Sequence, residues 1–178
     1  LQAAPITCYD PYGHDADNPD HYIPARAVEA ARWMAGSRDD PEQMDVVKPH
    51  TVTERYYFAR GPQRINRIVD ISKFIDIKVK ANEVCKTQGP GGDSGARLKK
   101  RLADEGKKLP ILGEDEQTAN FNYIKNLVLD IDSERLRGVP SDRAVGQQYG
   151  LEWAERFHYI GRTPSKTEDY IQQHAKPL

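Results

Sequence analysis

The sequence has little cysteine and no long apolar run. Its only cysteines, Cys8 and Cys85, lie far apart and form no C-x-x-C pair, so a reduced, cytoplasmic setting is expected. No apolar run approaches the roughly 18 residues that a membrane span needs. No basic stretch followed by an apolar one marks a signal peptide. The sequence therefore predicts a cytoplasmic protein with no membrane partner.

Charge of one sign is also lacking. The chain has 26 basic and 27 acidic residues and a formal net charge of −1, so nothing global attracts nucleic acid or an anionic surface. The basic run 99–101 is interpreted as a solvated helix face, because nucleic-acid binding would need a wider basic surface with stacking aromatics. The glycines at 89–92 lack the Lys-Ser/Thr pair of a phosphate-binding P-loop. These features argue against nucleic acid as a partner.

Enough apolar sequence is present to build a core. The chain has 178 residues, of which 38% are hydrophobic, and this length suits a single domain over residues 1–178. β-Branched and aromatic content predicts strands at Ile6–Tyr9, Thr51–Ala59 and Trp153–Phe157. Apolar spacing, caps and breakers predict helices over Pro24–Met34, after Asp70, over Ser94–Gly106, from Thr118, over Ser141–Gly150 and from Thr163.

The helix after Asp70 carries several specific expectations. Either Asp70 or Ser72 could cap it. Its buried stripe is expected at Ile71, Phe74, Ile75, Ala81 and Cys85. This stripe gives Cys85 a buried thiol, whereas Lys78 and Lys80 can stay in water.

A loop rich in Asp, Asn and Gly precedes the first helix and delivers one imidazole, that of His21, to the helix start. Pro24 suits the first turn of this helix, because its missing N–H would have no partner there. Open α/β folds place their functional groups at such a rim of the sheet. His21 is therefore a candidate metal ligand, and the plainer alternative is a capping or packing histidine.

The order and spacing of several short motifs resemble the PIG-L/LmbE family of zinc-dependent de-N-acetylases. The motifs are Tyr9-Asp10-Pro11, Gly13, Asn18-Pro19-Asp20-His21, the Tyr-Tyr-Phe strand, Asp70-Ile71-Ser72 with Lys78 and Ala81, Thr87-Gln88, and Ala154-Glu155-Arg156-Phe157. They cover most of this chain but only the C-terminal portion of a family member, whose early His-Pro-Asp-Asp loop has no counterpart here. The resemblance implies a Rossmann-like three-layer α/β sandwich.

The resemblance also implies a zinc site. Family members bind zinc through a His and an Asp of the early loop and the last His of a later His-Pro-Asp-His motif, which corresponds to His21. Asn18 stands where the family has the first His of that motif, and it could donate a hydrogen bond. Tyr12 is the nearest candidate for a Tyr that assists in some members, and Asp20 is interpreted as an orienting acceptor.

One imidazole does not make a catalytic zinc site, which needs three protein ligands and a position for water. The missing ligands could come from the same loop, where His14 and Asp17 precede His21. They could also come from an upstream segment or a partner chain. The other histidines have no ligand spacing and are interpreted as structural, and Glu155 is interpreted as an ordinary surface ion rather than a partner of the site.

The implied function is a metal-dependent hydrolase, in which zinc-activated water attacks the N-acyl group of a small molecule such as an amino sugar. One alternative is a hydratase similar to 4-oxalomesaconate hydratases, with Arg26, Arg55, Arg60 and Arg64 as candidates to hold carboxylates. Another is a non-catalytic subunit or degenerate homologue. An exposed sheet edge would favour a partner chain or a homo-oligomer.

Overall fold

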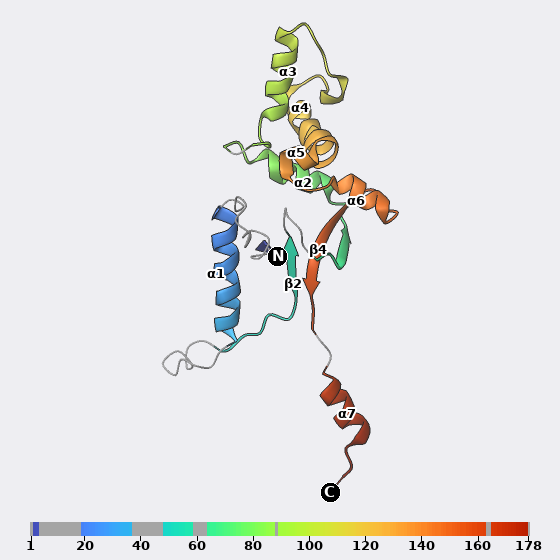
Figure 1. Ribbon diagram of the computed structural model, residues 1–178. Coiled ribbons are helices and arrows are strands. Elements are labelled where there is room, and N and C mark those ends of the chain that lie inside the picture. Colours follow the sequence, from blue (N-terminus) through green and yellow to red (C-terminus); the bar gives the residue numbers. More distant parts are fainter. Residues whose placement is uncertain are drawn as a thin grey trace.

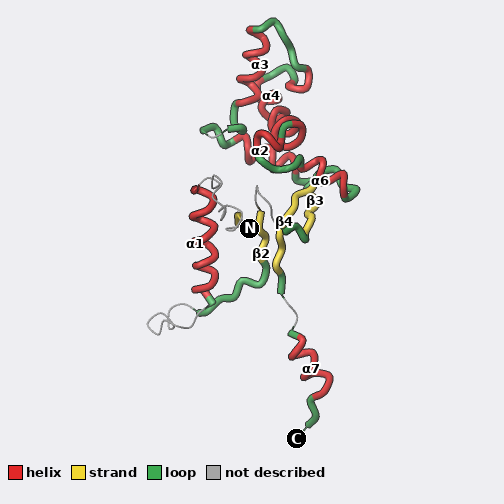
Figure 2. The backbone as a smooth tube through the Cα atoms, viewed as in Figure 1, coloured by secondary structure: helices red, strands yellow, loops and turns green. Residues whose placement is uncertain are grey.

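The computed structural model describes residues 2–3, 19–36, 48–58, 64–87, 89–162 and 165–177, and it has a mixed α/β fold. Its strands are β1 (Gln2–Ala3), β2 (Arg55–Phe58), β3 (Arg67–Asp70) and β4 (Ala154–Ile160). They form one sheet in the order β1-β2-β4-β3 (Figure 2). β1 is parallel to β2, whereas β4 is antiparallel to both of its neighbours.

Helix α1 (Pro19–Ala35) connects the two parallel strands, so β1, α1 and β2 form a βαβ unit. Figure 1 shows α1 beside the sheet, with its first turn at the same end as the arrowhead of β2. The predicted start at Pro24 is wrong, because the helix already includes Pro19. Pro24 lies inside it and lacks the N–H that would bond to the carbonyl of Asp20. The predicted end is confirmed, since the Gly36 N–H turns back to the Trp33 carbonyl at 3.2 Å.

Most of the remaining chain is helical. The elements are α2 (Ile75–Glu83), α3 (Ser94–Asp104), the short 3-10 helix η1 (Pro110–Leu112), α4 (Glu116–Asn122), the π-helix η2 (Tyr123–Ile131), α5 (Ser133–Arg137), α6 (Asp142–Gln148) and α7 (Lys166–His174). In Figure 1, α2 to α6 gather at one end of the sheet and α7 extends beyond the other end. Among the described residues, no helix has both the length and the apolar content to cross a lipid bilayer.

The main core lies where α2 and η2 meet the start of β4. It consists of Ile71, Ile75, Val79, Ile124, Val128, Leu129 and Trp153. Trp153 is fully buried just before β4, so this residue ties the helices to the sheet. Gly146 of α6 makes this packing possible, because a Cβ there would lie 2.8 Å from the Trp153 backbone nitrogen.

The burial of residues in and around α2 differs from the prediction at three positions. Ile71, Ile75 and Val79 face the core at a spacing of four residues, which turns Phe74 and Cys85 outward. The expected burial of Phe74, Ala81 and the Cys85 thiol is therefore wrong, although Ile71 and Ile75 are buried as predicted.

Neither Asp70 nor Ser72 caps α2, whose N-cap position is Phe74 without a side-chain bond. Asp70 ends β3, and its carboxylate accepts hydrogen bonds from the Ser72 hydroxyl at 2.6 Å and N–H at 2.9 Å. These bonds lower the pKa of Asp70. The Ser72 oxygen in turn accepts the Trp153 N–H at 3.1 Å. The Asp-Ile-Ser segment therefore joins β3 to β4 rather than starting the helix.

The other predicted strands and helices agree with the structure only in part. The strand at Ile6–Tyr9 lies outside the described residues, and the strand predicted over Thr51–Ala59 is formed only at Arg55–Phe58. β3 was not predicted, because four residues give too short a pattern. The helix predicted to start at Ser141 begins at Asp142 with Ser141 as its N-cap. Ser94, predicted as the cap of the basic helix, is instead the first residue of α3, after Asp93. The last helix begins at Lys166 with Ser165 as its cap, later than predicted.

Candidate functional site

The start of α1 carries the residues that the sequence singles out. Asp20 is exposed in the first turn, and His21 follows it in the same turn. His21 was expected where the loop meets the start of the helix, and the structure places its backbone in the first turn of α1. The N–H groups of a first turn have no intrahelical partner, so this end of α1 has a positive potential. The side chain of His21, and all of Tyr12, His14, Asp17 and Asn18, lie outside the described residues.

No metal centre assembles among the residues that the structure describes, since no three His, Cys, Asp or Glu side chains come together there. The three described imidazoles are widely separated. His158 lies in β4 with its ring 5.7 Å from that of Tyr57, and His174 stacks on Tyr170 in α7 at 4.2 Å. His50 is exposed after α1. The described residues therefore do not fit a complete zinc site, and a site at His21 needs ligands from outside them.

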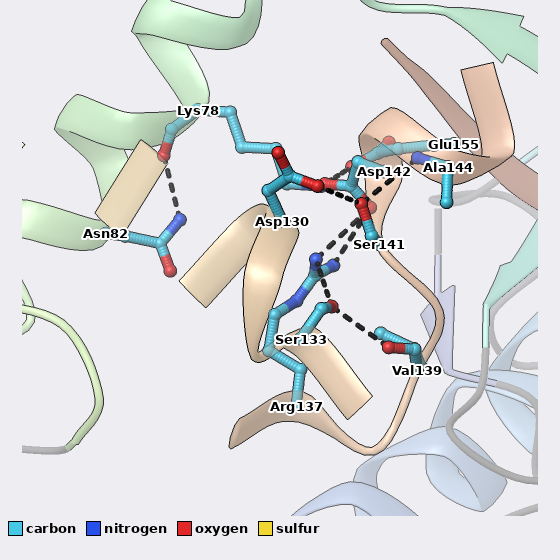
Figure 3. Close-up of polar contacts among 10 residues, drawn as sticks. All are labelled: Lys78, Asn82, Asp130, Ser133, Arg137, Val139, Ser141, Asp142, Ala144 and Glu155. Atoms are coloured by element: carbon cyan, nitrogen blue, oxygen red, sulfur yellow. Dashed lines mark hydrogen bonds and ion pairs between the residues drawn. The ribbon is translucent and has the colours of Figure 1, made fainter. Parts of the chain in front are cut away.

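A buried carboxylate, that of Asp142, organises the largest polar cluster in the described chain (Figure 3). Its side chain is only 6% exposed. One oxygen accepts a hydrogen bond from Lys78 Nζ at 2.7 Å, and the other accepts one from Arg137 Nη2 at 3.3 Å. Lys78 also forms an ion pair with Glu155 of β4. This cluster, the Asp142 network, thus joins α2, α5, α6 and β4.

The network continues through the cap of α6. The Ser141 hydroxyl donates to Asp130 Oδ1 at 2.8 Å and accepts the Ala144 N–H at 3.1 Å. Arg143 Nε lies 3.0 Å from Asp130 Oδ2, an ion pair without hydrogen-bond geometry. The same guanidinium stacks on the buried Trp153 ring at 4.4 Å. The polar cluster and the apolar core are therefore in direct contact.

The charges of the network cancel. Its members are three cations, Lys78, Arg137 and Arg143, and three anions, Asp130, Asp142 and Glu155. Each has a partner of opposite charge, so none is free to bind substrate or move a proton without breaking a pair. We interpret the network as the structure that fixes the helices on the sheet.

Two expectations are corrected by this network. Lys78 does not stay in water, because it bridges Asp142 and Glu155 with only 22% of its side chain exposed. Glu155 is not an ordinary surface ion but a half-buried partner of Lys78. Asp142 was missed altogether: following Ser141, it has the pattern of an exposed acidic residue in a first helical turn, and only the arrival of α2 and α5 buries it.

A second cluster lies between α1 and β2. The Tyr57 hydroxyl donates to Glu29 Oε1 at 2.6 Å, and the other oxygen of Glu29 accepts from Arg32 Nε and Nη2 at 3.0 and 2.8 Å. Burial and the bond to Glu29 raise the pKa of Tyr57. Arg55 Nη1 donates to the Tyr57 oxygen at 3.3 Å, whereas Arg55 Nε is buried without a partner among the described residues. Arg55 thus has one buried donor that no described residue satisfies.

No protein-family model matches this chain. Its function has therefore to be argued from its own residues and from the order of its motifs.

Proposed function

We propose that this chain forms part of a metal-dependent hydrolase similar to the PIG-L/LmbE de-N-acetylases, acting on the N-acyl group of a small molecule. One observation carries the proposal. The βαβ unit sets the first turn of α1, with Asp20 and His21, at the end of the sheet where β2 has its carboxyl end (Figure 1). Open α/β folds bind ligands at that end of their strands.

The fold expected for such an enzyme is a Rossmann-like three-layer sandwich. Parallel strands occur almost always in sheets with both faces covered. The parallel pair β1 and β2, with α1 beside it, supports one such layer. A further α/β segment would widen the sheet and supply the other layer.

The orientation of α1 supports this further segment. Its side toward β2 carries the small buried Ala25 and is otherwise polar, because Glu29 bonds to Tyr57 there and Arg32 lies one turn further on. The opposite side is apolar and exposed, formed by Ile23, Ala27, Ala30 and Met34. Met34 is 71% exposed. A helix in an α/β protein normally buries such a stripe, so we infer that an upstream segment or a partner chain packs on it.

That same segment would complete the metal site. Zinc held by His21 and two further ligands would supply hydroxide at neutral pH, since the metal lowers the pKa of bound water to about 7. His14 and Asp17 are the candidate ligands within this chain. Tyr12 and Asn18 would then donate hydrogen bonds to the reacting acyl oxygen, and Asp20 would orient the loop.

A hydratase acting on an unsaturated carboxylate is the second candidate. The observation in its favour is Arg55, whose unpartnered Nε could bind a carboxylate. The two activities are separable by assay. Release of a free amine from N-acetylated amino sugars measures the hydrolase, and loss of alkene absorbance from an unsaturated tricarboxylate measures the hydratase. Arg55→Leu should abolish only the second activity.

The test of the proposal is zinc content, measured by mass spectrometry in the chain alone and in the chain purified with its accompanying polypeptides. We expect about one zinc per chain in one of the two preparations. Zinc in the chain alone would assign the ligands His14, Asp17 and His21. Zinc only in the accompanied preparation would assign a shared site.

The matched variants are His21→Ala, which should remove the zinc, and His174→Ala, which should keep it because His174 is exposed in α7. Equal zinc in wild type and His21→Ala would overturn the ligand assignment. Absence of zinc from both preparations would overturn the enzyme proposal and leave a non-catalytic homologue.

A further inference from the structure

Helix α2 and the two residues that cap it carry a second apolar stripe on the side away from the core. Phe74, Ile77, Ala81 and Val84 recur at spacings of three and four residues and are all exposed. Ile77 is 64% exposed and Val84 is 76% exposed. On a helix, this spacing places the four side chains along one line, the pattern of a helix-packing seam. We call these four residues the α2 stripe.

Unpaired positive charge borders the α2 stripe. Lys73, just before the N-cap of α2, and Lys80, within the helix, are both exposed beside the stripe, and the charge of Lys73 also acts on Asp70. Neither forms an ion pair within the described part of the chain. Asp76, in contrast, already pairs with Lys125 at 2.7 Å. A partner for this surface should therefore present an apolar face with a carboxylate at its edge.

Helix α7 presents such a face. None of its side chains is buried. Figure 1 shows α7 extending beyond the end of β4, at the opposite end of the sheet from α2. Tyr170 and Ile171 form a small apolar side, with the polar Thr167 and His174 one turn away in each direction and the His174 ring against that of Tyr170. Glu168 flanks this side, and it too has no ion-pair partner among the residues described.

We propose that two copies of this chain associate by exchanging α7, each copy laying this helix on the α2 stripe of the other. Tyr170 and Ile171 would cover Phe74 and Ile77, and Glu168 would face the lysines at the border. The α2 stripe and α7 belong to one chain but lie at opposite ends of the sheet. A second copy of the chain can therefore bring an α7 onto each α2 stripe. The exchange is reciprocal and closes as a two-fold dimer.

The proposal goes beyond the proposed enzyme and does not depend on it. It uses α2 and α7, whereas the metal site and its completing segment use α1. Loss of the dimer should therefore leave zinc content unchanged, and loss of zinc in His21→Ala should leave the dimer unchanged.

The first test measures molar mass by light scattering across a concentration series. Ile77→Asp and Ile171→Asp should each raise the dimer dissociation constant by about a hundredfold, because each buries a charge in the contact. Ile131→Asp is the matched control, since Ile131 is more exposed than either residue, at 71%, and lies outside both surfaces. All three positions are on the surface, so helical circular dichroism should stay at the wild-type value.

The second test traps the contact directly. In a Cys8→Ser, Cys85→Ser background, a copy with Ile171→Cys is mixed with a copy with Ile77→Cys, because the proposed contact places Ile171 over Phe74 and Ile77. Oxidation should link the two copies through a single disulfide. A monomer at every concentration, or a dimer that Ile77→Asp dissociates and Ile171→Asp does not, would overturn the exchange of α7.

Discussion

Lys78 and Asp142 lie 64 positions apart in the sequence and meet at 2.7 Å between Nζ and Oδ2. This pair joins α2, on one side of the core, to α6, which packs against β4. Because Asp142 also accepts from Arg137, one buried carboxylate holds two cations in place. The pair therefore decides how the helical part of the chain is seated on the sheet.

Asp142→Asn should lower the free energy of unfolding by about 2 kcal/mol, because it leaves Lys78 and Arg137 partly buried without their shared anion. Urea unfolding measures this loss. The matched control is Asp76→Asn, which removes a carboxylate that is 60% exposed and should cost about 0.5 kcal/mol or less. Equal losses in the two variants would show that burial of Asp142 contributes nothing.

Gly146→Ala should destabilise the protein by about 1–3 kcal/mol, because the new methyl group would press against the backbone of Trp153. Thermal unfolding followed by tryptophan fluorescence is suitable, since Trp153 is at the contact. Gly36→Ala is the control: its Cβ would lie 3.7 Å from the nearest atoms, an ordinary contact. A wild-type melting temperature for Gly146→Ala would contradict the close approach of α6 and β4.

Tyr57 should make the protein less stable at high pH. Its folded pKa is raised, by burial first and by the bond to Glu29 second. Its contribution is therefore fully present below the unfolded value of about 10 and is lost as pH rises through the folded value. Urea unfolding between about pH 9 and 11 should show a smaller loss in Tyr57→Phe than in wild type. Part of the stability that Tyr57→Phe still loses at high pH comes from Tyr159, whose pKa is raised by its bond to Glu54. Identical losses in both proteins would be the contrary result.

Asp115 should make the stability of the protein depend on pH in the opposite direction, with a loss at low pH. Its carboxylate caps α4 by accepting from the Thr118 hydroxyl at 2.6 Å and N–H at 2.8 Å, and these bonds lower its pKa. The contribution is present above the unfolded value of about 3.9 and is lost as pH falls through the lower folded value. Thr118→Val should raise the pKa of Asp115 in an NMR titration, whereas Thr118→Ser should keep it low. An unchanged value in Thr118→Val would refute the role of the hydroxyl.

Local signals in the sequence locate much of the fold. The helix predicted from Ser141 is found within one residue of that start, because the bond of the Ser141 hydroxyl to the Ala144 N–H forms within one turn and needs no distant partner. The cap of α4 is predicted three residues late, since Thr118 and Asp115 are both good caps and only geometry chooses between them. β3 escapes prediction because its four residues are stabilised by pairing with β4, more than 80 positions away.

The candidate site was much less predictable. His21 stands out by residue type and motif, but the ligands proposed to join it would depend on contacts that no local pattern encodes. Lys78 and Glu155 were assigned to the surface because charged side chains usually lie there. The pairing of Lys78 with both Asp142 and Glu155 depends on the meeting of three distant elements, which composition and spacing do not specify.

The strand order has a consequence for how the chain folds. β2 and β3 do not pair with each other, since β4 lies between them. Bonds such as that of Tyr159 to Glu54 span 105 positions. During synthesis, β2 and β3 therefore emerge long before the strand that joins them, while the helices between them can already collapse locally. A ribosome-bound nascent chain stopped before residue 154 should hold its helices without the antiparallel part of the sheet.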